Sequence, residues 1–120
     1  MFNFLRPASA NANQPSLSQI ADGVAKGEIT LVDVREAGEV RASGKAKGAL
    51  NIPLGVLQLK ADPSAPDALL RPGKPVALYC ASGGRSGMAA QMLQRMGYAP
   101  VWNIGGLGDW HAAGGQVERS

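Results

Sequence analysis

The residue whose type and surroundings most clearly predict chemistry is Cys80, the single cysteine of the 120-residue sequence. It ends an apolar run typical of a buried strand, and a helical pattern begins shortly afterwards, at Ser86. A helix N-terminus offers free backbone N–H groups and a positive dipole end, which favour a thiolate over a thiol. We therefore predict that Cys80 is a reactive nucleophile.

The loop between Cys80 and Ser86 adds two features that stabilise an anion. Gly83 and Gly84 can adopt backbone angles that other residues avoid, which lets successive N–H groups turn toward the sulfur. Arg85 contributes a permanent positive charge. The same surroundings would stabilise a persulfide anion. A lone cysteine is more often a small buried residue and a single glycine a plain turn, but the combination favours a catalytic loop.

No catalytic base accompanies the cysteine in the sequence. His111 is the only histidine and follows Trp110 in the last helical segment, where we predict a surface or packing role for it. A Cys-His dyad of the protease kind is therefore not expected. A single cysteine cannot form a disulfide or a cysteine-based metal cluster within the chain, and we predict neither a metal nor another cofactor.

The segments that must position Cys80 alternate between helical and strand patterns. The predicted helices span residues 16–26, 36–42, 86–96 and 107–113, and the predicted strands span 29–34, 49–52, 76–80 and 101–104. Prolines interrupt residues 54–75 and leave room only for short helical pieces near Leu57 and Leu69. This alternation predicts an α/β domain with a mainly parallel sheet of four or five strands. In such sheets ligands bind beyond the carboxyl ends of the strands, where Cys80 lies.

Length and composition indicate one globular domain, with 45% hydrophobic and 18% charged residues. We predict a flexible tail over residues 1–15 and the domain over residues 16–120. Arg6 and Pro7 interrupt the apolar residues of the tail, so a signal peptide is not expected, and no apolar run approaches the roughly 20 residues that cross a bilayer. The net charge of +3 is mild and scattered. We therefore expect no nucleic-acid or membrane partner and a cytoplasmic location.

The segment 80–86 resembles the active-site loop of rhodanese domains, in which Cys-x-x-Gly-x-Arg is followed by Ser or Thr and a helix. Three further segments are similar to the family in the same order: 31–36 (Leu-Val-Asp-Val-Arg-Glu), 48–54 (Gly-Ala-Leu-Asn-Ile-Pro-Leu) and 97–110, with Gly-Tyr, an apolar strand, Gly-Gly and a tryptophan. The resemblance covers residues 16–118. It implies a rhodanese-like three-layer fold with helices on both faces of the sheet.

The resemblance also implies a two-step sulfur transfer. The Cys80 thiolate attacks a small anionic donor such as thiosulfate, sulfite leaves, and the persulfide passes its sulfur to cyanide, a thiol or an acceptor protein. The residues implied to present N–H groups to the persulfide are Ala81, Ser82, Gly83, Gly84, Arg85 and Ser86. By the same resemblance Asp33 and Arg35 support the first strand through hydrogen bonds and an ion pair. Trp110 is expected to pack the last helix on the sheet.

One segment departs from the family pattern. Where the family usually shows Gly-His-Ile, this chain has Gly44, Lys45 and Ala46. That histidine is generally interpreted as structural, so its replacement concerns local packing more than catalysis. We offer the hypothesis that Arg41, Lys45 and Lys47 attract anionic donors. The alternative is a solvated basic face.

Two other functions remain open on the sequence. Cysteine phosphatases and arsenate reductases also place a cysteine on an anion-binding loop before a helix, and they resemble Cys-x5-Arg. Here the sixth residue after Cys80 is Ser86 and the arginine comes one position earlier, so the shorter loop favours a single sulfur over a tetrahedral oxyanion. The second alternative is a non-catalytic rhodanese-like binding or redox-sensing module, a class that commonly lacks the cysteine.

Overall fold

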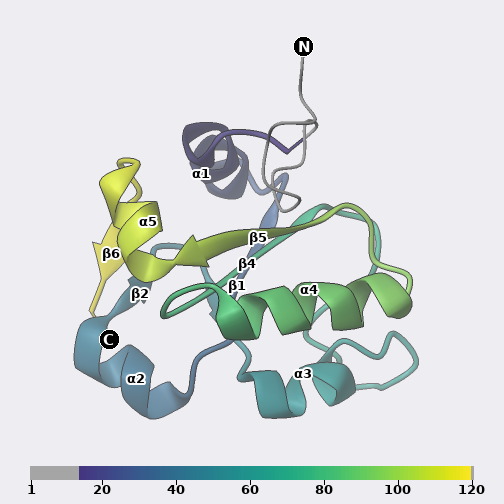
Figure 1. Ribbon diagram of the computed structural model, residues 1–120. Coiled ribbons are helices and arrows are strands. Elements are labelled where there is room, and N and C mark those ends of the chain that lie inside the picture. The colour runs from purple at the N-terminus through teal and green to yellow at the C-terminus, as the bar shows by residue number, and fades with distance from the viewer. Residues whose placement is uncertain (1–13, 120) are drawn as a thin grey trace.

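The computed structural model describes residues 14–119 (Figure 1). Most of the predicted tail, residues 1–13, lies outside the described residues. The helices are α1 (Leu17–Ala25), α2 (Ala37–Ser43), α3 (Leu54–Lys60), α4 (Gly84–Arg95) and α5 (Leu107–Ala112). The strands are β1 (Thr30–Asp33), β2 (Lys45–Ala46), β3 (Leu50–Asn51), β4 (Val76–Cys80), β5 (Val101–Gly106) and β6 (Val117–Glu118).

Four strands form a parallel sheet in the order β3-β1-β4-β5. All five residues of β4 are buried, as expected for an inner strand of a parallel sheet. The parallel sheet and its covering helices confirm the predicted α/β fold class. Because the strands run in one direction, their carboxyl ends meet at one edge, and Cys80 is the last residue of β4 there.

Alternate residues of the strands enter two separate hydrophobic cores. In β4, Val76, Leu78 and Cys80 belong to the core that contains residues of α3 and α4. Ala77 and Tyr79 belong to the core that contains residues of α1 and α5. In Figure 1 these helix pairs lie on opposite sides of the sheet, α1 and α5 above it and α3 and α4 below. The period of two along a strand thus places the cysteine on the α4 side.

The first helix begins where its sequence predicts. The Ser16 hydroxyl accepts from the Gln19 N–H at 3.2 Å, and the Gln19 side chain accepts from the Ser16 N–H at 2.9 Å. This reciprocal capping satisfies two backbone donors that the helix itself leaves free. Ile20 is fully buried and attaches α1 to the sheet.

Two predicted helical segments need correction. The helix after the cysteine begins at Gly84 and not at Ser86, because Gly83 already serves as its N-cap, with a φ of 105°. The short helical piece predicted near Leu69 is wrong. That segment is a turn in which the Leu69 and Leu70 N–H groups both bond to the Lys60 carbonyl.

A second sheet was not predicted. β2 and β6 form an antiparallel pair that joins Lys45 to Glu118 and Ala46 to Val117. Strands of two residues are too short to show a periodic pattern, so only their pairing in the structure identifies them. No helix in the described part of the chain combines the length and apolarity needed to span a membrane.

Candidate active site

Cys80 lies at the end of β4 with donors wrapped around its sulfur. The residue is 1% exposed. The backbone N–H of Gly83 turns back toward the thiol, with 3.0 Å between N and Sγ. Gly83 can do this because its φ of 105° lies in the left-handed region that glycine tolerates. The Ser86 hydroxyl, from the first turn of α4, lies 3.4 Å from the same sulfur.

These donors change the acidity of the thiol. Burial raises the pKa of Cys80, but the Ser86 side chain and the N–H groups of Ser86, Ser82 and Gly83 lower it by more. The pKa therefore falls from an ordinary value of 9.0 to about 7. At pH 7 about half of the thiol is then ionised. The turn thus stabilises the anionic form of the sulfur, while a catalytic role for Cys80 stays a prediction.

The predicted loop residues do not contribute equally. Ser82, Gly83 and Ser86 supply the donors to the sulfur. Gly84 does not supply the unusual backbone angle expected of it, because it is the first residue of α4 and Gly83 alone makes the left-handed turn. Ala81 is exposed at the rim of the turn.

Arg85 is held by a carboxylate that the sequence reasoning missed. Its guanidinium bonds both oxygens of Glu39, at 2.6 and 2.9 Å, and one of these oxygens also accepts the Glu36 N–H at 3.0 Å. The Arg85 side chain and the Glu36 backbone lower the pKa of Glu39 to about 2. Glu39 raises the pKa of Arg85, and the charge on Cys80 raises it further. Arg85 is therefore held by Glu39, and part of its charge is already balanced.

Asn103 of β5 is the second residue of the candidate site that the sequence reasoning missed. Its Nδ2 donates to the Gly83 carbonyl at 2.9 Å. Its Oδ1 accepts from the Ser86 hydroxyl at 2.7 Å and from the Gly105 N–H at 3.0 Å. The side chain therefore ties the cysteine turn to the neighbouring strand. A polar residue inside the apolar run 101–104 was the signal that could have found it.

A bulge in β5 follows Asn103. Leu78 pairs with Asn103, but Cys80 pairs with Gly106, so β5 contains one residue more than β4 over this interval. Bulges of this kind redirect side chains and occur often beside active sites. No sequence pattern in this strand predicted it.

Asp33 and Arg35 form a separate polar network at the end of β1. Arg35 is 4% exposed and Asp33 is fully buried, and their charged groups lie 2.7 Å apart. The Tyr79 hydroxyl donates to Asp33 at 2.7 Å and accepts from the Ala46 N–H at 2.8 Å. Tyr79 belongs to the core opposite that of Cys80. The structural role of Asp33 and Arg35 stays a prediction, and these contacts place both residues in a buried network apart from Cys80.

The three basic residues near the segment that departs from the family pattern lie in different surroundings. Lys45 pairs with Glu118 at 2.7 Å, across the β2–β6 sheet. Arg41 and Lys47 are exposed. Because Glu118 balances the charge of Lys45, this pair attracts anions less than a free lysine would.

A family model described as the rhodanese-like domain matches residues 16–113. The chain belongs to the rhodanese-like domain family. The matched range includes the cysteine turn, which the sequence predicted, and also Glu39 and Asn103, which only the structure identified.

Relatives of this rhodanese-like domain carry several descriptions. It is 39% identical over 89 residues to the uncharacterized protein YqhL of Bacillus subtilis, covering 73% of this chain and 63% of YqhL. It is 40% identical over 63 residues to the thiosulfate sulfurtransferase PspE of Escherichia coli, covering 52% of this chain and 57% of PspE. The chain therefore spans less than two thirds of these curated relatives.

A solved structure from Rhodopseudomonas palustris has the same fold, with a TM-score of 0.74 and 34% identity. The match covers 85% of this chain and 81% of that one. That structure is described as a protein of unknown function and a possible tyrosine phosphatase. Its description names one of the alternatives that the sequence left open.

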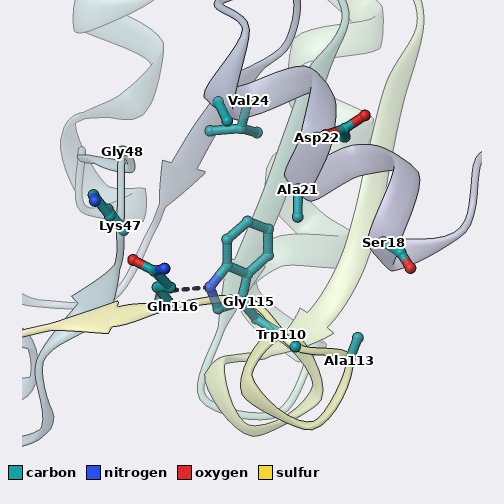
Figure 2. Close-up of a pocket in the computed structure, with 12 residues that line it drawn as sticks. Ser18, Ala21, Asp22, Val24, Lys47, Gly48, Trp110, Ala113, Gly115 and Gln116 are labelled. Carbon is teal, nitrogen blue, oxygen red and sulfur yellow. Dashed lines mark hydrogen bonds between the residues drawn. The ribbon is translucent and has the colours of Figure 1, made fainter.

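The rhodanese-like domain has a hollow of about 600 Å³ whose lining does not include Cys80 (Figure 2). It is lined from α1, from the turn after β2 and from the segment after α5. Trp110 forms part of its wall, with Nε1 donating to the Gln116 carbonyl at 2.7 Å, while packing in the core beneath α1. None of the residues predicted to bind substrate lines it. Within residues 14–119 no cluster of three or more His, Cys, Asp or Glu could hold a metal ion.

Proposed function

We propose that this domain is a sulfurtransferase that moves a sulfane sulfur from a small anionic donor such as thiosulfate to cyanide or a thiol. The observation that carries the proposal is the Gly83 N–H, 3.0 Å from Cys80 Sγ, in a turn that lowers the pKa of the thiol to about 7. A thiolate is the nucleophilic form of cysteine. The name of the relative PspE, thiosulfate sulfurtransferase, supports the same reaction.

The proposed reaction has two balanced steps. The Cys80 thiolate attacks the outer sulfur of thiosulfate, a new S–S bond forms, and the bond to the sulfonate sulfur breaks as sulfite leaves with its electron pair. The product is a Cys80 persulfide whose negative charge lies on the outer sulfur. Cyanide or a thiolate then attacks that outer sulfur, and the electron pair of the broken S–S bond returns to Cys80 as a thiolate. No proton transfer from a histidine is needed.

Each part of the turn has a role in this scheme. The N–H groups of Ser82, Gly83 and Ser86 stabilise the anionic sulfur before and after it accepts the second atom. Arg85, held in place by Glu39, binds the negatively charged donor. Burial of the cysteine favours a donor as small as thiosulfate, because the residue is 1% exposed.

Phosphate-ester hydrolysis is the second candidate, because the Rhodopseudomonas palustris neighbour is described as a possible tyrosine phosphatase. A phosphatase must surround a tetrahedral oxyanion with N–H groups and an arginine. In this chain α4 begins at Gly84, after only three loop residues. This short turn favours stabilisation of a single sulfur over a site that surrounds a phosphate group.

The test is to incubate the protein with thiosulfate and measure its intact mass. We expect a gain of one sulfur atom that disappears on adding cyanide. Cys80→Ser should gain nothing, while Asp22→Asn, a substitution on the exposed face of α1, should behave as the unmodified protein. Hydrolysis of an aryl phosphate without any sulfur uptake would replace this proposal with the phosphatase.

Besides cyanide, the acceptor in our proposal is a thiol, either free or carried by an acceptor protein. A thiolate has the charge and softness needed to attack the outer sulfur. The single cysteine also fits a reducing compartment, and a cytoplasmic location stays a prediction of the sequence.

A further inference from the structure

The Ser86 hydroxyl has one proton and more than one acceptor. Its oxygen lies 2.7 Å from Asn103 Oδ1, 3.4 Å from Cys80 Sγ and 3.5 Å from the Gly105 carbonyl. A serine hydroxyl donates a single hydrogen bond and can accept others. The direction of that one proton therefore decides whether Ser86 stabilises the cysteine as an anion or as a thiol.

The orientation of the Asn103 amide is determined by two backbone groups. Its Nδ2 meets the Gly83 carbonyl at 2.9 Å, and its Oδ1 meets the Gly105 N–H at 3.0 Å. Turning the amide over would place two donors against each other and two acceptors against each other. Oδ1 must therefore face Ser86, and Ser86 must donate if the 2.7 Å contact is a hydrogen bond.

We propose that Asn103 is a positioning residue that competes with Cys80 Sγ for the single proton of the Ser86 hydroxyl. When Cys80 is a thiol, the Ser86 O–H points to Asn103 and its lone pairs can accept the S–H. When Cys80 is a thiolate, the O–H turns to the sulfur. Only rotation about the Cβ–Oγ bond is needed, because Ser86 is fully buried and Asn103 is held by the backbone.

The direction of the hydroxyl then follows the charge through the transfer cycle, and this part of the inference rests on the proposed function. In the persulfide the negative charge lies on the outer sulfur, so Sγ becomes a poorer acceptor and the O–H returns to Asn103. When the acceptor removes the outer sulfur, Sγ is again anionic and regains the hydroxyl. Asn103 thus keeps a second acceptor ready for the proton when the sulfur does not need it.

The test of this proposal substitutes only Asn103 and Ser86, so the charged residues near the sulfur are the same in every variant. Arg85 of α4, whose pKa is raised by Glu39 and also by the charge of Cys80, and its partner Glu39 of α2 are charged groups near the sulfur on the α4 side. Asp109 of α5 binds the Gly106 N–H at 2.8 Å, next to the end of β4. β4 and β5 contribute no charged side chain to this site. A change in the reactivity of the thiol that requires both Asn103 and Ser86 can then be assigned to the hydrogen bond between them.

The test is a double-mutant cycle on the reactivity of the thiol. The rate of alkylation by iodoacetamide at pH 6 is measured by intact mass for the native protein, Asn103→Ala, Ser86→Ala and the double variant. Removing the competing acceptor should raise the rate about threefold when Ser86 is present, the size of effect expected of one neutral hydrogen bond. In the Ser86→Ala background the same Asn103 substitution should not raise it.

The effect of Asn103→Ala on the alkylation rate is compared with Ser86 present and with Ser86→Ala. This comparison separates competition for the proton from simple anchoring of the turn. Loosening of the turn would change the rate equally with and without Ser86, and equal effects, or a larger fall with Ser86 present, would overturn the proposal. Asn51→Ala is the matched control, because Asn51 also binds two backbone carbonyls, those of Asp33 and Arg35, and should leave the rate unchanged. Alkylation needs no sulfur donor, so failure of the transfer reaction leaves the cycle readable.

Discussion

Tyr79 and Cys80 are consecutive residues of β4, and their side chains enter polar clusters on opposite faces of the sheet. The cluster at Tyr79 is closed. Asp33 is fully buried, and it accepts from Tyr79 and from three nitrogens of Arg35. No buried side-chain nitrogen or oxygen in the described residues lacks a hydrogen-bond partner.

The cluster at Cys80 is open by comparison. Arg85 is 36% exposed, and Ser86 has fewer protons than neighbouring acceptors. A closed network of charges can only be broken, at high cost, whereas an open one can redistribute its donors as charge moves. We expect the first cluster to maintain the fold and, under the proposed function, the second to perform the chemistry. Each prediction below tests that division.

Breaking the closed cluster should have the largest effect on stability. Asp33→Asn leaves the buried charge of Arg35 without its partner, and we expect a loss of about 3–5 kcal/mol in the free energy of unfolding. Chemical denaturation measures it. Asp22→Asn, the same change in an exposed pair with Lys26, should stay within about 0.5 kcal/mol. A loss for Asp33→Asn no larger than for Asp22→Asn would contradict the division.

The open cluster should respond most to pH. Because the pKa of Cys80 is about 7, the alkylation rate should fall about tenfold for each pH unit below that value, as the thiolate is protonated. The native pKa is depressed below the ordinary 9.0, so the free energy of unfolding should also rise between pH 7 and pH 9. Cys80→Ser should lack that rise. A rate that follows a pKa near 9 would show that the turn does not stabilise the thiolate.

The pair of Arg85 and Glu39 should show a smaller, kinetic effect. Glu39→Gln removes the carboxylate that holds both guanidinium nitrogens, and we expect KM for thiosulfate to rise several-fold with kcat nearly unchanged. Steady-state thiocyanate production measures both constants. Glu36→Gln, an exposed glutamate in the same segment, is the control. An unchanged KM would mean that the orientation of Arg85 does not matter for binding the donor.

The smallest effect is expected in the β2–β6 sheet, at the ion pair of Lys45 and Glu118. Lys45→Ala breaks an ion pair with Glu118, which is 44% exposed, so the melting temperature should change by no more than about 2 °C. Donor KM and its dependence on salt should not change, in Lys45→Ala or in Arg41→Ala. A weaker salt dependence in either variant would instead support the attraction of anionic donors by this basic face.

Much of this arrangement could be predicted from local patterns. The apolar run ending at Cys80, the helical period after Ser86 and the capping residues at Ser16 all depend on neighbours within a few positions. The resemblance to rhodanese domains predicted membership of that family, and the match to the family model confirms it. The early start of α4 escaped prediction because Gly83 completes the turn by itself.

The residues that hold the loop could not be found in this way. Glu39 meets Arg85 across 46 positions of sequence, and Asn103 meets Gly83 across 20. The bulge that follows Asn103 is a property of two paired strands and not of one. The β2–β6 sheet likewise exists only because distant segments meet.

The sequence by itself determined that a lone cysteine would end a buried strand and face the start of a helix, because hydrophobic period, glycine and helix dipole act over short distances. The tertiary structure decided which side chains share the proton of Ser86 and which carboxylate binds Arg85. Those choices depend on distances of a few ångströms between separate elements. Such distances exist only once the strands have aligned and both faces of the sheet are covered.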